Sequence, residues 1–290
     1  MAEEKDEHGR TRLWKACYEG HVDAVRLLLE KDADANRADK YGRTPLYIAC
    51  RSGHVHAAQL LLEKDAEVDR ARESGITPLY DACYDGQVDV ARLLLDKGAE
   101  VDRAMKDGST PLYIACQNGH VDAARLLLDK GAQVDRATND GRTPLYGACE
   151  YGHIAAAWLL LEKGADVDQA LFAACATGHV DFARLLLEKG ADVDQALFAA
   201  CATGHVDLAR LLLEKGADIR QILRRLSNYQ TGGGGPTPEM VALLRPRIEA
   251  ALRDMILEGG RGWAHIGELA FLAPRICGFY SSFQCNLMVS

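Results

Sequence analysis

Histidine and cysteine are the residue types in this chain that could ligate a metal, and both recur at fixed positions. Six histidines each follow a glycine, and seven of the nine cysteines each follow an alanine. They are His21, His54, His120, His153, His179 and His205, and Cys17, Cys50, Cys83, Cys116, Cys149, Cys175 and Cys201. Metal ligands must converge on one ion. Groups that recur once per repeat are spread along a molecule, so we expect no metal site and interpret the histidines as buried hydrogen-bonding residues at turns.

The repeated cysteines are not expected to form a ladder of disulfides. Equivalent positions in neighbouring packed helices lie about 8–10 Å apart, whereas a disulfide requires Cα atoms within about 7 Å. We interpret these cysteines as small buried residues of a protein from a reducing compartment, with metal binding as the alternative. Cys277 and Cys285 lie outside the repeats and receive no assignment.

The sequence shows no catalytic or cofactor-binding motif. It has no evident nucleophile and no clustered carboxylate pair, and its glycine run 232–235 lacks the Lys-Ser/Thr of a phosphate-binding loop. That run is predicted to be a linker. We therefore expect neither enzyme activity nor a cofactor.

The composition narrows the class of protein further. The chain has 290 residues, of which 48% are apolar and 26% charged, as is typical of a globular protein. Its net charge of −8 argues against nucleic acid as a partner. Residues 1–6 lack the order of a signal peptide, and no apolar run is long enough to span a membrane. A cytoplasmic monomer is expected, with the nucleus as another possible location.

Most of the chain consists of a repeated sequence. The phrase Gly-x-Thr-Pro-Leu-Tyr-x-Ala-Cys begins at Gly42, Gly75, Gly108 and Gly141, with a period of 33 residues. This period predicts a solenoid of stacked units, because one unit alone cannot bury its apolar face. In each unit the glycine is expected to form a tight turn, the threonine to cap a helix of about two turns, and the proline to occupy its first turn.

A second helix is predicted after the Gly-His pair of each unit. In the fourth unit the residues predicted to face inward are Val121, Ala124, Leu127 and Leu128, and those predicted to face water are Asp122 and Arg125. Gly131 is expected to end this helix in the left-handed conformation. Asp32 and Asp65 occupy that position in the first two units, where a side chain costs about 1 kcal/mol.

These motifs, in this order, resemble the ankyrin repeat, and the resemblance extends from Asp6 to about Ile222. It implies an all-α solenoid of helix-turn-helix units joined by hairpin fingers, with a concave face formed by the finger tips and the first helices. It also implies protein binding without catalysis. We therefore expect a protein partner, and neither nucleic acid nor a membrane.

The repeat also predicts the organisation of the chain. We expect an N-terminal tail at 1–5, the array at 6–222, a degenerate capping repeat at 223–258 and a C-terminal tail of unknown role at 259–290. The units of the array are 6–38, 39–71, 72–104, 105–137, 138–170, 171–196 and 197–222. The first unit lacks the proline of Thr-Pro, and its Arg10 and Arg12 suit an uncovered end.

Units six and seven have a spacing of 26 residues and lack the segment that corresponds to 138–144. That segment is the finger, so the stack of helices should continue while the row of fingers ends at the fifth unit. In place of the missing Thr-Pro, Asp168 and Asp194 are predicted to cap helices that begin at Gln169 and Gln195.

Two substitutions depart from the family pattern. The family's histidine in Thr-Pro-Leu-His is an aromatic residue here, which predicts a ladder of rings between the first helices, with tyrosine hydroxyls that reach a partner as the alternative. These residues are Trp14, Tyr47, Tyr80, Tyr113, Tyr146, Phe172 and Phe198. The family's asparagine is Asp69, Asp102 or Asp135, followed by Arg70, Arg103 or Arg136. Each pair is predicted to form an exposed ion pair worth under about 1 kcal/mol.

The repeat becomes irregular after Ile222. Residues 221–229 are predicted to form a first helix, and Thr237 and Pro238 the start of a second, which Pro246 should kink or end early. In the tail, residues 263–272 are predicted to form a short amphipathic helix that ends before Pro274.

Residues that vary between units mark the candidate binding surface. Finger tips and first-helix ends are expected to point into the concave groove, where tyrosine and arginine are common binding hot spots. The candidates are Tyr18, Lys40, Tyr41, Arg43, Arg51, Tyr84, Lys106, Gln117, Arg142 and Tyr151. The expected function is that of an adaptor or scaffold that binds a protein or extended peptide in this groove. The alternatives are a structural spacer, and a carrier whose C-terminal tail is the effector.

Overall fold

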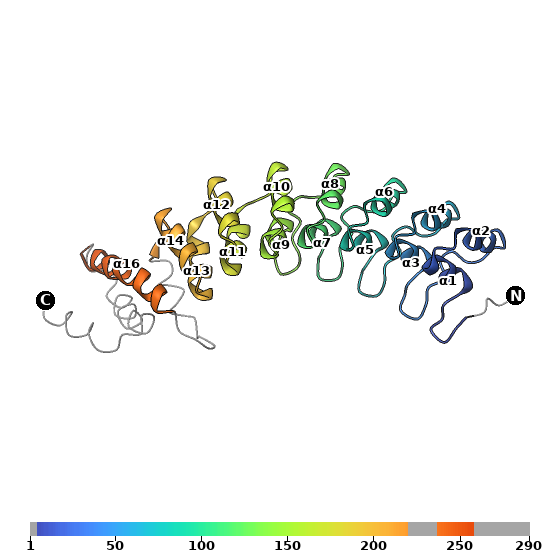
Figure 1. Ribbon diagram of the computed structural model, residues 1–290, viewed down its shortest axis with the longest axis horizontal. Coiled ribbons are helices and arrows are strands. Elements are labelled where there is room, and N and C mark those ends of the chain that lie inside the picture. Colours follow the sequence, from blue (N-terminus) through green and yellow to red (C-terminus); the bar gives the residue numbers. More distant parts are fainter. Residues whose placement is uncertain (1–4, 220–236, 258–290) are drawn as a thin grey trace. The chain divides into compact units, whose positions relative to one another are not determined.

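The computed structural model describes residues 5–219 and 237–257, with side chains as far as Ala251. These residues form helices and turns, and no strand occurs among them (Figure 1). The chain divides into two compact units, Met1–Asp166 and Val167–Ser290, which are described separately.

The first unit consists of five helix pairs. The first helices of the pairs are α1 (Arg12–Glu19), α3 (Pro45–Arg51), α5 (Pro78–Tyr84), α7 (Pro111–Gln117) and α9 (Pro144–Glu150). The second helices are α2 (Val22–Glu30), α4 (Val55–Glu63), α6 (Val88–Asp96), α8 (Val121–Asp129) and α10 (Ile154–Glu162). Within this unit each kind of helix forms its own row, and a hairpin finger precedes every first helix (Figure 1). The predicted all-α solenoid is confirmed.

The sequence explains where each first helix begins. Thr11, Thr44, Thr77, Thr110 and Thr143 are the N-caps, and each side chain accepts a hydrogen bond from the backbone N–H three residues later. Proline opens every first helix of this unit except α1. In the finger before α3, Gly42 has φ 74°, a left-handed conformation that glycine adopts at little cost. The predicted turn and cap are therefore confirmed.

The stripe that the second helices bury is shifted from the predicted one. In α8 the buried residues are Ala123, Ala124, Leu126 and Leu127. Val121 and Leu128 are only partly buried, so their predicted inward position is wrong: they flank a stripe centred between the alanine pair and the leucine pair. The helix ends are as predicted, because Gly131 has φ 88° while Asp32 and Asp65 have φ 58° and 57°.

Polar side chains at the finger bases connect neighbouring repeats. Each accepts a hydrogen bond from a backbone N–H in the next repeat, 31 residues later. The bonds run from Glu67 to Asn36, from Glu100 to Asp69, from Gln133 to Asp102 and from Asp166 to Asp135, at 2.8–3.1 Å. The predicted Asp-Arg pairs are wrong, because Arg70 and Arg103 pair instead with the glutamate three residues earlier.

The histidines that follow glycine also connect repeats. His54 Nε2 lies 3.1 Å from the carbonyl oxygen of Tyr18 in the preceding repeat, and His120 makes the equivalent contact at 3.0 Å. Gln87, at the same position, donates to the equivalent carbonyl at 2.9 Å. A Cβ on Gly20 would lie 2.5 Å from the His54 ring, so this glycine leaves room for the ring. The predicted hydrogen bonding is confirmed for His54 and His120, but their side chains are half-buried and the bonds cross between repeats.

The aromatic residues at the family's histidine position are not all enclosed. Trp14, Tyr47, Tyr80 and Tyr113 are buried, whereas Tyr146, Phe172 and Phe198 are partly exposed. The two phenylalanines lie in repeats that have no finger to cover them. Guanidinium groups lie over several of the rings: Arg72 over Tyr47 at 5.6 Å and Arg142 over Tyr146 at 5.3 Å. At Tyr47 and Tyr146 the ring is therefore in contact with a cation.

The second unit has helix pairs without fingers, as predicted. Its helices are α11 (Asp168–Thr177), α12 (Val180–Glu188), α13 (Val193–Thr203), α14 (Val206–Glu214) and α16 (Pro238–Leu257). The predicted caps are wrong, since α11 begins at Asp168 itself and the cap of α13 is Asp192. The Asp168 and Asp194 carboxylates instead accept hydrogen bonds from the backbone 24 residues later, at 3.0 and 2.8 Å.

Helix α16 covers part of the second unit. Thr237 caps it and accepts a hydrogen bond from the backbone of Met240 at 3.3 Å, as predicted. Its buried residues include Met240, Leu244 and Ile248, four positions apart. The helix continues past Pro246, so an early end is wrong: the apolar stripe extends on both sides of the proline. The helices predicted at 221–229 and 263–272 lie outside the described residues. In the described part no helix is long and apolar enough to cross a membrane.

Candidate functional site

Four half-exposed tyrosines lie on one surface of the first unit. Tyr18 is 57% exposed, Tyr41 54%, Tyr84 50% and Tyr151 54%, whereas Tyr47 inside the stack is 1% exposed. We call this surface the finger face. It comprises the finger tips 7–10, 40–43, 73–76, 106–109 and 139–142 and the first-helix ends 18–19, 51–52, 84–85, 117–118 and 150–151.

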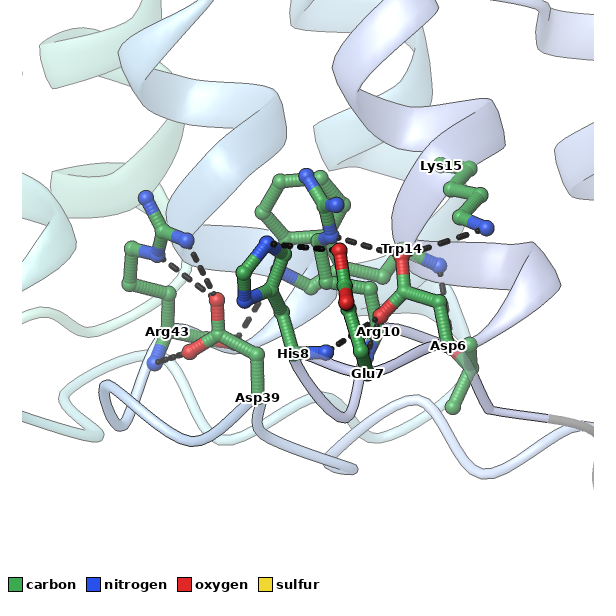
Figure 2. Close-up of polar contacts among 9 residues, drawn as sticks. Asp6, Glu7, His8, Arg10, Trp14, Lys15, Asp39 and Arg43 are labelled. Carbon is green, nitrogen blue, oxygen red and sulfur yellow. Dashed lines mark hydrogen bonds and ion pairs between the residues drawn. The ribbon is translucent and has the colours of Figure 1, made fainter.

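An aspartate and an arginine brace each of the first two fingers. The Asp39 carboxylate accepts hydrogen bonds from the backbone N–H groups of Tyr41 and Arg43, both at 2.9 Å, and binds the Arg43 guanidinium at 2.6–2.7 Å. Asp6 and Arg10 repeat this arrangement, with their side chains 2.8 Å apart (Figure 2). The side-chain geometry of both arginines is therefore fixed by their own fingers.

Further contacts strengthen the first brace. Lys15 Nζ lies 3.2 Å from the Asp6 carboxylate. Desolvation alone would raise the pKa of Asp6, but hydrogen bonds from Arg10 and Lys15 outweigh it and hold that pKa well below its ordinary value. Asp6 therefore stays ionised and keeps Arg10 in place.

Trp14 is the centre of a cationic and aromatic cluster. The guanidinium carbons of Arg10 and Arg43 lie 5.4 and 5.3 Å from its ring, and its indole N–H donates to the Arg43 carbonyl at 3.2 Å. Tyr18 stacks on Trp14 at 5.7 Å and 19°. Arg43 also lies 4.9 Å from the Tyr41 ring. Figure 2 shows the two aspartate-arginine pairs on either side of Trp14.

A cavity of about 440 Å³ opens beside this cluster, and we call it the Trp14 cavity. Its lining residues are Arg10, Trp14, Tyr18, Arg43, Ile48, Arg51 and Ser52. The structure thus brings together three of the predicted residues, Tyr18, Arg43 and Arg51, and places Tyr41 beside them. Sequence reasoning missed Arg10 and Trp14 as site residues. Arg10 occupies the same finger position as Arg43 and Arg142, which was the available signal.

Arg51 faces an unusual buried acid. Its Nε atom lies 3.9 Å from Oδ2 of Asp81, and that oxygen has no hydrogen-bond partner among the described residues. Asp81 is 9% exposed and occupies the position of Ile48 and Ile114 in the neighbouring repeats. A distance of 3.9 Å is that of an ion pair and not of a hydrogen bond. Burial alone would lower the pKa of Arg51, but the charge of Asp81 and a contact with Tyr47 outweigh it and raise that pKa.

The other predicted residues lie outside the Trp14 cavity. Lys40 lines a separate cavity of about 460 Å³ beside the first two fingers, with Gly9 and Asn36 among its other lining residues. Arg142 is neutralised by Asp140 at 3.0 Å and by Glu150 at 3.1 Å. The rest, which are spread over the third to fifth repeats, are Tyr84, Lys106, Gln117 and Tyr151. The described residues contain no cluster of His, Cys, Asp or Glu suited to a metal ion.

Comparison with known proteins identifies the class. The family model described as ankyrin repeats (3 copies) matches residues 13–105, 99–170 and 168–222, so the chain belongs to the ankyrin-repeat family. The crystal structure of the human ASB11 ankyrin repeat domain is similar, with 29% identity and a TM-score of 0.64, over 72% of this chain and 99% of that one. No curated protein sequence matches significantly. Ankyrin repeats are general protein–protein interaction modules and are generally non-enzymatic.

Proposed function

We propose that this protein is an adaptor or scaffold that binds a protein or an extended peptide on its finger face. The four half-exposed tyrosines carry this proposal. Tyrosine and arginine are enriched among the few residues that supply most of the binding energy at interfaces. The finger face presents both types from several repeats, whereas the tyrosine of the stacking position is buried in three repeats.

The rigidity of the surface supports the same function. Tyr18 is stacked on Trp14, and the first two fingers are braced by Asp6 and Asp39. A preformed surface loses less conformational entropy on binding than a mobile one, so more of the contact energy appears as affinity. We propose a monomer that acts in the cytoplasm or nucleus; the seven free, buried thiols support a reducing compartment. The net charge of −8 favours a protein over nucleic acid as the partner.

Site-specific photo-crosslinking tests this function. Tyr41, Tyr84 and Tyr151 are replaced one at a time by a photoreactive phenylalanine derivative in the full chain, which is then irradiated in cells. We expect each variant to yield discrete protein adducts. As matched controls, the same derivative is placed at Arg92 and Arg125, which are exposed on the second helices. Adducts at the controls alone, or at no position, would mean that the finger face is not a binding surface.

Two further variants separate the alternatives. Triple substitution of Tyr41, Arg51 and Tyr84 by alanine should abolish adducts at Tyr151 while the far-ultraviolet circular dichroism stays unchanged. Deletion of residues 259–290 should leave those adducts in place. If the deletion alone removes the partner, the tail is the effector and the repeats are its carrier. If neither form gives an adduct, the array is a spacer.

A further inference from the structure

The solvent side of the Trp14 cavity is cationic. Three of its seven lining residues are arginines and none is acidic. The carboxylates that balance Arg10 and Arg43 lie behind them: the Asp39 side chain is 0% exposed and that of Asp6 is 19% exposed. These carboxylates hold the arginines without entering the cavity.

The arginines are also positioned for a planar anion. Asp39 binds Nε and Nη2 of Arg43, and Asp6 binds Nε of Arg10, so each guanidinium keeps further N–H groups for a ligand. Both guanidiniums stack on Trp14, which restricts their rotation. A pre-positioned guanidinium matches a carboxylate with two parallel hydrogen bonds. Arg51 belongs to the second repeat, like Arg43, and its Nε lies 3.9 Å from Oδ2 of Asp81.

The remaining walls are apolar. Trp14, Tyr18 and Ile48 supply surface against which the methylene groups of a side chain can pack. A volume of about 440 Å³ lies within the usual range of about 300–1,000 Å³ for ligand pockets. Apolar walls with convergent cations suit a carboxylate on a short aliphatic stem.

We propose that the Trp14 cavity binds the side chain of a glutamate or aspartate in an extended segment of the partner protein. The carboxylate is bound by Arg10, Arg43 and Arg51, and the stem packs on the Trp14 and Tyr18 rings. This inference rests on the proposed function, because the acidic residue belongs to the protein or peptide bound on the finger face.

Other repeats lack this arrangement. The fingers of the third and fourth repeats place Ile76 and Ser109 where the first two have arginine. The fifth repeat restores an arginine, but two carboxylates bind Arg142, and the Asp140 side chain is 62% exposed where that of Asp39 is fully buried. The acidic side chain is therefore bound at the N-terminal end of the finger face. This contact fixes the position of the bound segment along that face.

The test begins with random peptides of about 12 residues, which span about 40 Å when extended. They are displayed on phage and selected against the full chain. We expect the selected peptides to share a glutamate or aspartate. Replacement of that residue by Gln or Asn, measured by fluorescence anisotropy with synthetic peptides, should weaken binding at least about tenfold, as expected for loss of a charge-assisted hydrogen bond. This arm leaves the protein unaltered.

Charge reversal in the protein provides the second arm. Arg51→Glu should weaken binding of the same peptides at least about tenfold. Arg125→Glu makes the same change in net charge on an exposed residue of α8 and should change the affinity less than about twofold. Equal losses of affinity in the two variants would indicate general electrostatic attraction between peptide and protein rather than binding in the Trp14 cavity, and would overturn the proposal.

The outcomes separate this inference from the proposed function. Peptides that crosslink at Tyr84 but show no acidic preference, or that ignore Arg51→Glu, would overturn the acidic pocket and leave the finger face as a binding surface. A peptide that binds only with phosphoserine in place of its glutamate would make phosphate the ligand and also overturn it. Failure to select any peptide, together with absent crosslinks, would remove the proposed function and this inference with it.

Discussion

Oδ1 of Asp168 accepts a hydrogen bond from the backbone N–H of Asp192 at 3.0 Å. Asp135 makes the same bond with the backbone of Asp166, also at 3.0 Å. The partners are 24 residues apart in the first pair and 31 in the second. The difference equals the seven residues by which the repeat shortens from 33 to 26. Loss of the finger therefore leaves the bond between successive repeats intact.

Asp168→Ala should lower the free energy of unfolding by about 1 kcal/mol, because a backbone N–H of the next repeat loses its acceptor. Asp168→Asn should be nearly neutral, since Asn36 makes the equivalent bond through its Oδ1 at 2.8 Å. Urea denaturation followed by circular dichroism distinguishes the two. Equal losses for alanine and asparagine would show that charge, and not this hydrogen bond, matters at residue 168.

Local features of the sequence predicted most of the fold. Period, threonine caps, proline positions and left-handed glycines act within a few residues, so the helix pairs, the fingers and the missing fingers could all be predicted. Contacts between repeats were harder to predict from the sequence. Asp69 and Arg70 are adjacent and opposite in charge, which favoured an ion pair, yet each has another partner. The backbone N–H of Glu100 comes within reach of Asp69 only when the repeats stack, so neighbouring residues in the sequence did not reveal this partner.

The candidate site was predicted only in part, again because the sequence does not show contacts between repeats. Exposure of Tyr18 and Tyr84 follows from their place at the end of a short helix, which the sequence shows. The Trp14 cavity depends on two fingers and two helices meeting, and the sequence does not show that Arg10 and Arg43 lie over the same ring. Nor does it show that Arg142 is already paired.

Asp65→Gly should stabilise the protein. Asp65 has φ 57°, whereas the equivalent Gly98 has φ 88° and an added Cβ there would meet nothing within 4 Å. The strain is therefore in the backbone, and relief of it should add up to about 1 kcal/mol to the free energy of unfolding. Differential scanning calorimetry measures the rise in Tm. Asp65→Ala keeps the Cβ and serves as control; an equal rise for alanine would exclude backbone strain as the cause.

Asp81→Ile should also stabilise the protein, because it removes a buried oxygen that has no hydrogen-bond partner among the described residues. The gain in the free energy of unfolding is expected to be about 1 kcal/mol or more. Ile114→Asp places the same acid in the next repeat, where Ile114 is 6% exposed, and should destabilise the protein. Urea denaturation of both variants checks the pair. A loss of stability in Asp81→Ile would show that the acid is compensated where it lies.

The seven repeated cysteines should be inert in the folded protein. Burial raises the pKa of Cys17, Cys149, Cys175 and Cys201 to about 12, from an ordinary value of 9.0, and that of Cys50, Cys83 and Cys116 still further. The reactive thiolate is therefore scarce at pH 8. In a variant with Cys277→Ser and Cys285→Ser, a chromogenic disulfide reagent should react with seven thiols in denaturant and with almost none in the native state.

The same pKa shifts predict how the stability of the protein changes at alkaline pH. Between pH 9 and 12 the folded protein keeps thiol protons that the unfolded chain has lost. The contribution of the buried thiols to the free energy of unfolding is therefore complete below pH 9 and declines as pH rises toward 12. Tm measured on the double-serine variant should fall from pH 8 to pH 10. Replacement of Cys149 by alanine, a residue of similar size without a proton to lose, should make that fall shallower. An unchanged slope, or rapid native-state labelling at pH 8, would show that these thiols are exposed in solution.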